Sequence, residues 1–205
     1  MRLMIAIPTM DIVHIDFVRS LTKLIEHLKD DGVDYELAID NGTLVYIARH
    51  HLAVKAVREN FDQVLWLDSD MVFNEEIYDD LRFCHKPIVS GVCHSRRRPF
   101  TCCLFADLDL NHLTRANWQE HREPFKVAGC GMAACLMDVQ VIRDVLKEYG
   151  QTFTPMESYG EDLAFCKRAG ELGYEIWADP DVRVGHIGHL TIWPDEVQKW
   201  EEIIR

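Results

Sequence analysis

The sequence predicts a single α/β domain built around a mostly parallel sheet, and three observations support this prediction. The 205 residues suit one domain of ordinary size. Short apolar runs, typical of buried strands, alternate with longer segments whose apolar residues recur every three or four positions, as on one face of a helix. This alternation runs from residue 3 to residue 93, and it is the pattern that produces a parallel sheet covered by helices.

The first half of the chain carries the clearest pattern. Strands are expected at 3–7, 35–39, 64–67 and 88–93, and helices at 15–28, 45–59 and 75–83. Pro8 ends the first strand, and Asn41-Gly42 ends the second. Ligands bind at the carboxyl ends of the strands in such sheets, so residues that directly follow a strand are candidates for a site.

The second half is less regular. Strands are expected at 101–105, 175–178 and 182–184, and helices at 139–149, 161–172 and 194–204. A flexible glycine turn is expected at 129–131, and a polar loop or short helix at 108–124. No linker or repeat divides the chain, so we expect one domain over residues 1–205.

Charge and cysteine content limit the function classes. The net charge of −12 disfavours nucleic-acid binding by bulk electrostatics, although Arg96-Arg97-Arg98 forms a local basic run. We interpret this run as a solvated loop, with a phosphate clamp as the alternative. The seven cysteines include no CxxC pair, which favours reduced thiols and a cytoplasmic protein. No signal peptide is visible, and no run approaches the roughly 20 apolar residues of a membrane helix.

The strongest chemical signal is Asp68-Ser69-Asp70, which follows the apolar run at 64–67. Carboxylate oxygens are the ligands that Mg²⁺ and Mn²⁺ prefer, and these ions commonly bridge to substrate phosphates. A solvated turn after a strand is the simpler alternative. Two similar pairs rank lower: Asp107 with Asp109 follows a weaker strand, and Asp179-Pro180-Asp181 has the composition of a turn.

Two further signals lie in the second half. Glu161 and Asp162 open a predicted helix after Gly160, where acidic residues either stabilise the helix N-terminus or act as a general base. His186 and His189 lie in a glycine-flanked segment, and a neutral imidazole is a common metal ligand. Each signal also has a purely structural interpretation when it is taken alone.

Taken together, these motifs resemble the GT-A-type glycosyltransferases, and most closely the short family-2-like enzymes of bacteria and phages. The similar segments are the opening strand that ends in Pro8-Thr9, Ala48-Arg49, residues 65–73 with the DxD motif, residues 87–92, the glycine turn at 129–131, the "ED" helix from Glu161, Ala178-Asp179-Pro180, and His186. They occur in the family's order over nearly the whole chain.

The resemblance implies a GT-A sandwich, a Rossmann-like fold in which residues 1–100 bind the nucleotide and residues 101–205 hold the acceptor and part of the metal site. It implies transfer of a sugar from a nucleotide-sugar, with UDP as the expected nucleotide, and a Mn²⁺ or Mg²⁺ cofactor. By position, Thr9 and Arg49 would contact the donor, and Asp68, Asp70 and His186 would bind donor or metal, with His189 as the rival ligand. Asp162 would be the base of an inverting enzyme, with Glu161 as the second candidate.

The match has two departures. His50 and His51 stand where the family has Asn after Arg49, which weakens the role expected for Arg49. No segment after His189 matches the family's acceptor-binding tail, so we expect a small acceptor or a partner protein to complete the site. The acceptor stays open among a glycan, a lipid-linked sugar, a protein and modified phage DNA. Two other functions are weighed: a non-catalytic nucleotide-sugar binding module, and a sugar nucleotidyltransferase, whose usual glycine-rich loop is absent after Pro8.

Overall fold

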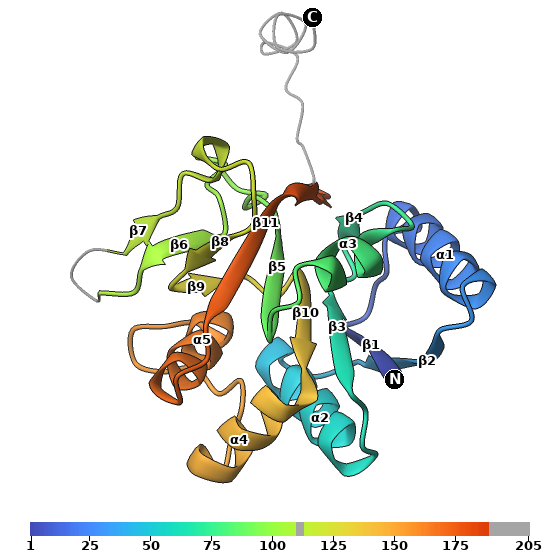
Figure 1. Cartoon of the computed structure of the whole chain (residues 1–205), viewed down its shortest axis with the longest axis horizontal. Helices are drawn as coiled ribbons and strands as arrows, with labels where there is room; N and C mark the ends of the chain where they lie inside the picture. The colour runs from blue at the N-terminus through green and yellow to red at the C-terminus, as the bar shows by residue number, and fades with distance from the viewer. Residues whose placement is uncertain (110–112, 189–205) are drawn as a thin grey trace, which may run out of the picture.

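The computed structural model describes residues 1–109 and 113–188, and it shows a mixed α/β protein with helices on both faces of a central sheet (Figure 1). In spatial order, the seven strands of this sheet are β2 (Asp34–Asp40), β1 (Arg2–Pro8), β3 (Gln63–Leu67), β10 (Ala134–Asp138), β5 (Ile88–Val92), β11 (Ile176–Arg183) and β8 (Phe125–Val127). The predicted α/β class is therefore confirmed.

The sheet is mostly parallel, as expected. Strand β1 runs parallel to β2 and β3, and β5 runs parallel to β11. Strand β10 lies between β3 and β5 and is antiparallel to both, while β8 is antiparallel to β11 at the edge. Five strands therefore share one direction, and β10 and β8 oppose them. This arrangement is consistent with the GT-A sandwich that the sequence resembles.

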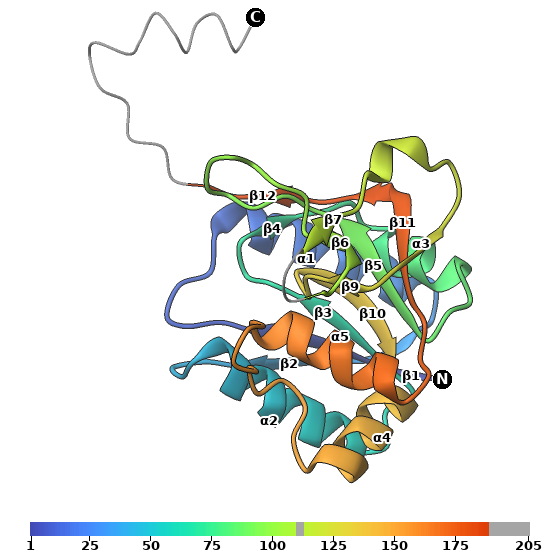
Figure 2. The same cartoon turned by 90° about the vertical axis from the view of Figure 1, so that its left-hand side faces the viewer.

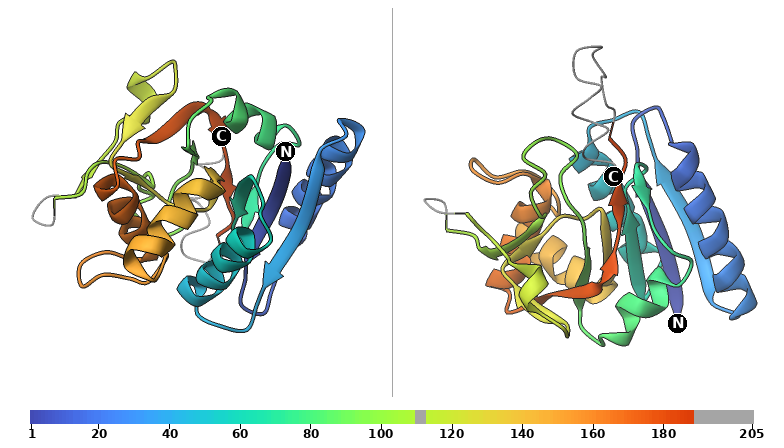
Figure 3. Two further views of the ribbon diagram at one scale, coloured as in Figure 1. Left: turned by 60° about the horizontal axis from the view of Figure 1, so that its bottom comes forward. Right: turned by 90° about the horizontal axis from the view of Figure 1, so that it is seen from above.

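Helices cover both faces of the sheet because the central strands are apolar on both sides (Figures 2 and 3). In β1, Leu3, Ile5 and Ile7 belong to the apolar cluster that includes residues of α1 (Ile15–Asp30) and α3 (Ile77–Phe83). Met4 and Ala6 belong to the opposite cluster, which includes residues of the three other helices: α2 (Val45–Arg58), α4 (Val139–Tyr149) and α5 (Glu161–Glu171).

Two small sheets complete the described structure. Strands β4 (Met71–Val72) and β12 (Gly185–His186) form an antiparallel pair. The second sheet contains β7 (Thr114–Arg115), β6 (Leu104–Asp107) and β9 (Gly129–Cys130), and a short 3-10 helix spans Trp118–Glu120. The β4–β12 pair matters most for function, because it joins the segment after β3 to the segment after β11.

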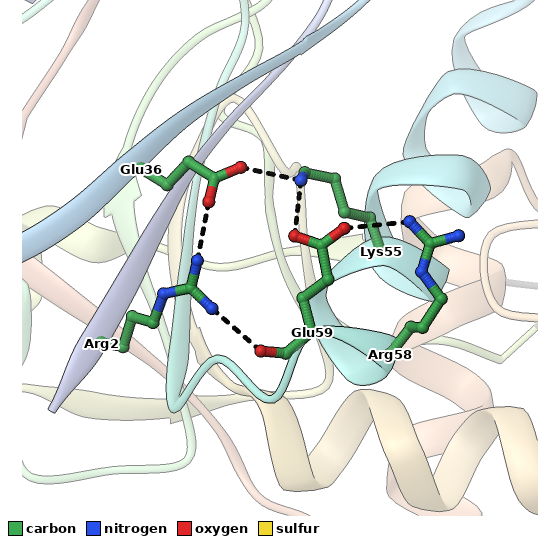
Figure 4. Close-up of polar contacts among 5 residues, drawn as sticks. All are labelled: Arg2, Glu36, Lys55, Arg58 and Glu59. Atoms are coloured by element: carbon green, nitrogen blue, oxygen red, sulfur yellow. Dashed lines mark hydrogen bonds and ion pairs between the residues drawn. The ribbon is translucent and has the colours of Figure 1, made fainter.

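A network of ion pairs ties the N-terminal strands to α2 (Figure 4). Glu36 of β2 contacts Arg2 of β1 at 2.8 Å and Lys55 of α2 at 2.7 Å. Lys55 also contacts Glu59 at 2.7 Å, and Glu59 contacts Arg58 at 2.9 Å. Exposed pairs of this kind contribute about 0.2–1 kcal/mol each, and here they fix the orientation of α2, the helix that carries Arg49.

Some sequence-based boundaries were wrong. The strands expected at 175–178 and 182–184 form one strand, β11, and Asp179-Pro180-Asp181 lies inside it instead of in a turn. The register with β5 shifts between Ala178 and Arg183, and such an irregularity accommodates a proline that cannot donate to the ladder.

The remaining expectations on local structure have mixed outcomes. The strand expected at 101–105 begins only at Leu104, and the expected loop at 108–124 contains β7 and the 3-10 helix. The helix expected at 194–204 lies outside the described residues. All seven cysteines are free thiols. Within residues 1–109 and 113–188, no helix has both the length and the apolar character needed to cross a membrane.

Candidate active site

The candidate site lies at the edge of the sheet where β1 and β3 end. Thr9 follows β1 and Asp68 follows β3, as the sequence predicted. Because β10 is antiparallel to β3, its N-terminal end, with Met132 just before it, lies at the same edge. Because β11 is parallel to β5, its C-terminal end brings the chain to His186 at this edge as well. Strand direction therefore gathers residues from both halves of the chain.

A cavity of about 500 Å³ opens at this edge. Its wall includes Thr9, Asp68, Ser69, Asp70 and Arg96, together with apolar side chains of the segment between β1 and α1. The Thr9 hydroxyl lies 3.0 Å from the Ser69 hydroxyl, which joins the ends of β1 and β3. A concave site of this size, with apolar walls and a few converging polar groups, suits a small organic ligand.

Asp70 and His186 face each other at the cavity. The β4–β12 pair places His186 opposite Met71, the residue after Asp70, and the His186 Nε2 lies 3.4 Å from the Asp70 Oδ2. The other ring nitrogen, Nδ1, lies 2.9 Å from the carbonyl oxygen of His94. In the neutral ring this second contact favours the tautomer that carries its proton on Nδ1, so that Nε2 could bind a metal. In the charged ring Nε2 also carries a proton and donates it to Asp70.

The electrostatics of this pair reflect their proximity. Burial works to raise the pKa of Asp70, but the hydrogen bond and charge of His186 and the charge of Arg96 lower it overall. The Asp70 hydrogen bond raises the pKa of His186, against the effect of burial. Arg96 forms an ion pair with Asp70. The sequence had placed Arg96 in a solvated basic loop, and the structure shows instead that its guanidinium contacts the second carboxylate of the DxD motif.

Arg49 occupies a different position from the one that the family resemblance implies. Its side chain is only 1 % exposed and is absent from the residues that line the cavity, so it does not face a ligand there. Its Nη2 lies 2.8 Å from Asp68 Oδ1, and its Nε lies 3.4 Å from Asp162 Oδ1. Burial works to lower the pKa of Arg49, but the two carboxylates raise it overall, so the guanidinium stays charged.

The flexible turn expected at 129–131 was wrong in part, because Gly129–Cys130 forms strand β9 and pairs with β6. Asp162, in the first turn of α5, lies next to Met132 in the segment between β9 and β10. Its Oδ2 accepts a hydrogen bond of 3.2 Å from the backbone N–H of Met132. Burial raises the pKa of Asp162 to about 7, and the charge of Arg49 opposes that rise. A methyl group built on Gly131 would lie 3.8 Å from Asp162 Oδ2 and 3.3 Å from the Cβ of Cys103. The added methyl group would thus be in ordinary contact with the carboxylate and in a tighter contact with Cys103.

The predicted site residues therefore fall into two groups. Thr9, Asp68 and Asp70 line the cavity, with His186 in contact with Asp70, and Arg49 links Asp68 to Asp162. Glu161, also in the first turn of α5, is half-buried beside Asp162. His189, the rival metal ligand, lies outside the described residues.

The lower-ranked acidic pairs lie elsewhere. Asp107 and Asp109 line a separate cavity of about 560 Å³ beside α5, and none of the catalytic candidates lines it. Asp179 accepts a hydrogen bond from the thiol of Cys84 at 3.2 Å. Of the three acidic pairs, the pair of Asp68 and Asp70 lines the cavity at the ends of β1 and β3, and the other two do not.

Another cluster with metal-binding side chains is present at the far end of α1. Within the described residues, ligand atoms of His27, Asp31 and Asp79 all lie within 4.8 Å of one another. His27 Nε2 lies 2.7 Å from Asp79 and 3.4 Å from Asp31, which a simple ion-pair cluster explains. The hydrogen bond that the protonated His27 ring donates to Asp79 raises the pKa of His27 and favours its charged form.

Comparisons with known proteins bear on the fold. No protein-family model matches the sequence, and a search of curated proteins finds no match. Among solved structures, A197 from STIV is similar with a TM-score of 0.57 and 14 % identity, over 94 % of this chain and 97 % of that one. A glycosyltransferase involved in the glycosylation of the major capsid of PBCV-1 matches with a TM-score of 0.44 and 12 % identity, over 90 % and 94 % of the two chains. At such identities these similarities concern the fold, and the second is too low to support a functional conclusion.

Proposed function

We propose that this chain is a metal-dependent glycosyltransferase that moves a sugar from a nucleotide-sugar, with UDP as the first nucleotide to test, to an acceptor hydroxyl. One observation carries the proposal: Asp70, which lines a cavity of about 500 Å³ together with Thr9 and Asp68, lies 3.4 Å from His186 of the second half of the chain. His186 itself lines a second cavity of about 400 Å³, and Arg96 lines both. Carboxylates and an imidazole at the mouth of a small-molecule cavity suit a divalent cation and a diphosphate.

On the donor side, Asp70 and the Nε2 of His186 are the best-placed metal ligands, with Asp68 beside them. The fit is supported by the His94 carbonyl, which engages Nδ1 and leaves Nε2 directed toward Asp70. A bound Mn²⁺ or Mg²⁺ would neutralise the charge that develops on the nucleoside diphosphate as it leaves. The Thr9 hydroxyl would hydrogen-bond the nucleotide, and Arg96 would offer its planar guanidinium to phosphate oxygens.

On the acceptor side, Asp162 would be the general base. It would take the proton of the acceptor hydroxyl as that oxygen attacks the anomeric carbon, from the face opposite the departing diphosphate, so that the configuration inverts. A pKa of about 7 suits this role, because the carboxylate is then basic enough to accept a proton and still substantially ionised at neutral pH. Glu161 is the alternative base one residue earlier.

A donor-hydrolysis screen tests the proposal without knowledge of the acceptor. The protein is incubated with a panel of UDP-, GDP-, dTDP- and CMP-sugars, with Mn²⁺, with Mg²⁺ and with EDTA, and release of the nucleotide is measured. We expect slow hydrolysis of one donor class that EDTA abolishes and that Asp70→Asn removes. The matched control is Asp107→Asn, which alters a carboxylate of the separate cavity.

The outcomes separate the candidate functions. Metal-dependent binding of a nucleotide-sugar with no turnover, even across a panel of acceptors, would favour the binding module. Release of pyrophosphate from a nucleoside triphosphate and a sugar phosphate would favour the nucleotidyltransferase. Turnover that is equal in EDTA and in Asp70→Asn would contradict the metal site.

A further inference from the structure

We propose that Arg49 is a positioning residue that sets the separation between Asp68 on the donor side and Asp162 on the acceptor side. The inference rests on the proposed function for the roles of these two carboxylates. It departs from the resemblance, which places this arginine on the nucleotide. The arginine would act through the two carboxylates and would touch neither substrate.

The surroundings of Arg49 exclude a direct ligand contact in this structure. Its guanidinium carbon lies 5.9 Å from the centre of the Trp66 ring and 6.0 Å from that of Phe153, and the side chain is 1 % exposed. Phe153 in turn stacks on Phe165 of α5 with ring centres 4.5 Å apart. The guanidinium is thus held by the apolar layer between the sheet and the helix that carries Asp162.

One rigid group contacts both carboxylates. Nη2 lies 2.8 Å from Asp68 and Nε lies 3.4 Å from Asp162, while Nη1 donates to the carbonyl oxygen of Met132 at 3.5 Å. The backbone N–H of Met132 donates to Asp162, so Arg49, Met132 and Asp162 form a closed set of contacts. Because the guanidinium is planar and its donors are fixed in direction, a displacement of one carboxylate is transmitted to the other.

The energetics also point to positioning rather than to stability alone. A buried ion pair is weak evidence for stability, because well-packed apolar residues of similar volume are often as stable or more so. The contact of Arg49 Nε with Asp162 Oδ1 does not even satisfy either atom with a hydrogen bond. What this arrangement provides is a cation between two carboxylates that would otherwise repel each other at the floor of the site.

The chain offers a matched control in Arg168. This arginine is 2 % exposed and lies on α5, and its Nη1 donates to the carbonyl oxygen of Thr152 at 2.7 Å. It is therefore a buried arginine of the same layer that contacts a backbone group instead of the site carboxylates. Substitution of either arginine is expected to lower the melting temperature, so stability does not separate the two positions.

The experiment compares Arg49→Lys and Arg49→Met with Arg168→Lys and Arg168→Met, each first shown to be folded by near-ultraviolet circular dichroism. Donor hydrolysis is then measured as kcat and KM. We expect kcat of Arg49→Met to fall about 100-fold, the effect of misplacing a catalytic group by roughly 1 Å, with KM for the donor close to that of the wild type. Arg49→Lys should retain only a minor part of the wild-type kcat, because an ammonium lacks the planar set of fixed donors that a guanidinium presents. Both Arg168 variants should keep the wild-type kcat.

Chemical rescue of kcat by guanidinium ion provides a further test, because kcat would not recover if Arg49 served only the stability of the fold. In Arg49→Ala, added guanidinium ion at low millimolar concentration should restore part of the lost kcat, and sodium chloride at equal ionic strength should not. Equal kcat in the Arg49 and Arg168 variants, or full activity in Arg49→Lys, would overturn the positioning role while leaving the proposed function intact.

A crystal structure of Arg49→Met tests the inference even if the wild type hydrolyses no donor, in which case the proposed function itself has failed. We expect the separation of the Asp68 and Asp162 carboxylates to increase in that variant. An unchanged separation would overturn the inference.

Discussion

The substitution Asp162→Asn tests the catalytic assignment most directly, because it keeps the shape of the side chain and removes its basicity. Burial raises the pKa of Asp162 to about 7 from the ordinary value of 3.8. The ionised fraction of such a group rises from about 10 % at pH 6 to about 90 % at pH 8, whereas a carboxyl with an ordinary pKa would be ionised throughout. In the proposed mechanism the ionised form of Asp162 is the active one, so activity should be lost as the pH falls through the pKa of this group in the folded protein.

The assay is donor hydrolysis, or transfer once an acceptor is found, at saturating donor and saturating Mn²⁺ from pH 5.5 to 8.5. We expect the wild-type kcat to rise about tenfold between pH 6 and pH 8, following this ionised fraction. Asp162→Asn should lower kcat by about two to four orders of magnitude, the usual contribution of a general base, and should remove the rise with pH. Donor affinity should change little, because Thr9 and Asp70 lie on the other side of the site.

One confounding group has to be controlled. The pKa of His186 is also raised, so its protonation weakens metal binding at low pH. Calorimetric affinity for UDP with Mn²⁺, measured at each pH, shows whether the ion remains bound. A flat wild-type profile with the metal bound, or a wild-type rate in Asp162→Asn, would refute the reasoning. A loss of kcat in Glu161→Gln with none in Asp162→Asn would move the role to Glu161.

Three further predictions concern residues around the cavity. Asp70→Ala should abolish metal-dependent binding of UDP by calorimetry, and unchanged affinity would exclude Asp70 as a ligand. Arg96→Gln removes the cation paired with Asp70, so affinity for Mn²⁺ alone should rise by up to about fivefold, the value of an exposed pair; equal or weaker affinity would contradict this competition. Gly131→Ala places a methyl group 3.8 Å from the proposed base, so it should slow transfer more than donor binding, whereas Gly170→Ala, with open space around the added carbon, should not. In addition, a hydrogen bond from the Cys93 thiol lowers the pKa of Cys103 to about 7. Iodoacetamide at neutral pH should therefore label Cys103 before the other cysteines, as measured by peptide mass spectrometry. Earlier labelling of another thiol would contradict the lowered pKa of Cys103.

Local patterns in the sequence were sufficient for the fold class and for half of the site. The apolar run at 64–67 predicted β3, and with it the position of Asp68 and Asp70 at a strand end, because a buried strand requires several consecutive apolar residues. The acids that open α5 were likewise visible from the helical pattern that follows them. The prediction of a turn at Asp179-Pro180-Asp181 was wrong, because a proline, which usually favours a turn, can also lie in a strand whose pairing register shifts.

Contacts between distant segments could not be predicted in this way. The reversed direction of β10 places Met132 beside Asp162, and the β4–β12 pair places His186 beside Asp70. Arg96 looked like one charge in a solvated loop, and no local signal distinguishes it from its neighbours.

The sequence by itself determined the strand–helix order, the acidic residues at the strand and helix ends, and the chemistry that those residues can perform, because these depend on neighbours in the chain. Only the tertiary structure decided that Arg49 is buried and in contact with both Asp68 and Asp162. The physical reason is that burial and ion pairing depend on which strands and helices become neighbours in space. The local sequence around an arginine does not show whether its guanidinium faces a phosphate or contacts two buried carboxylates.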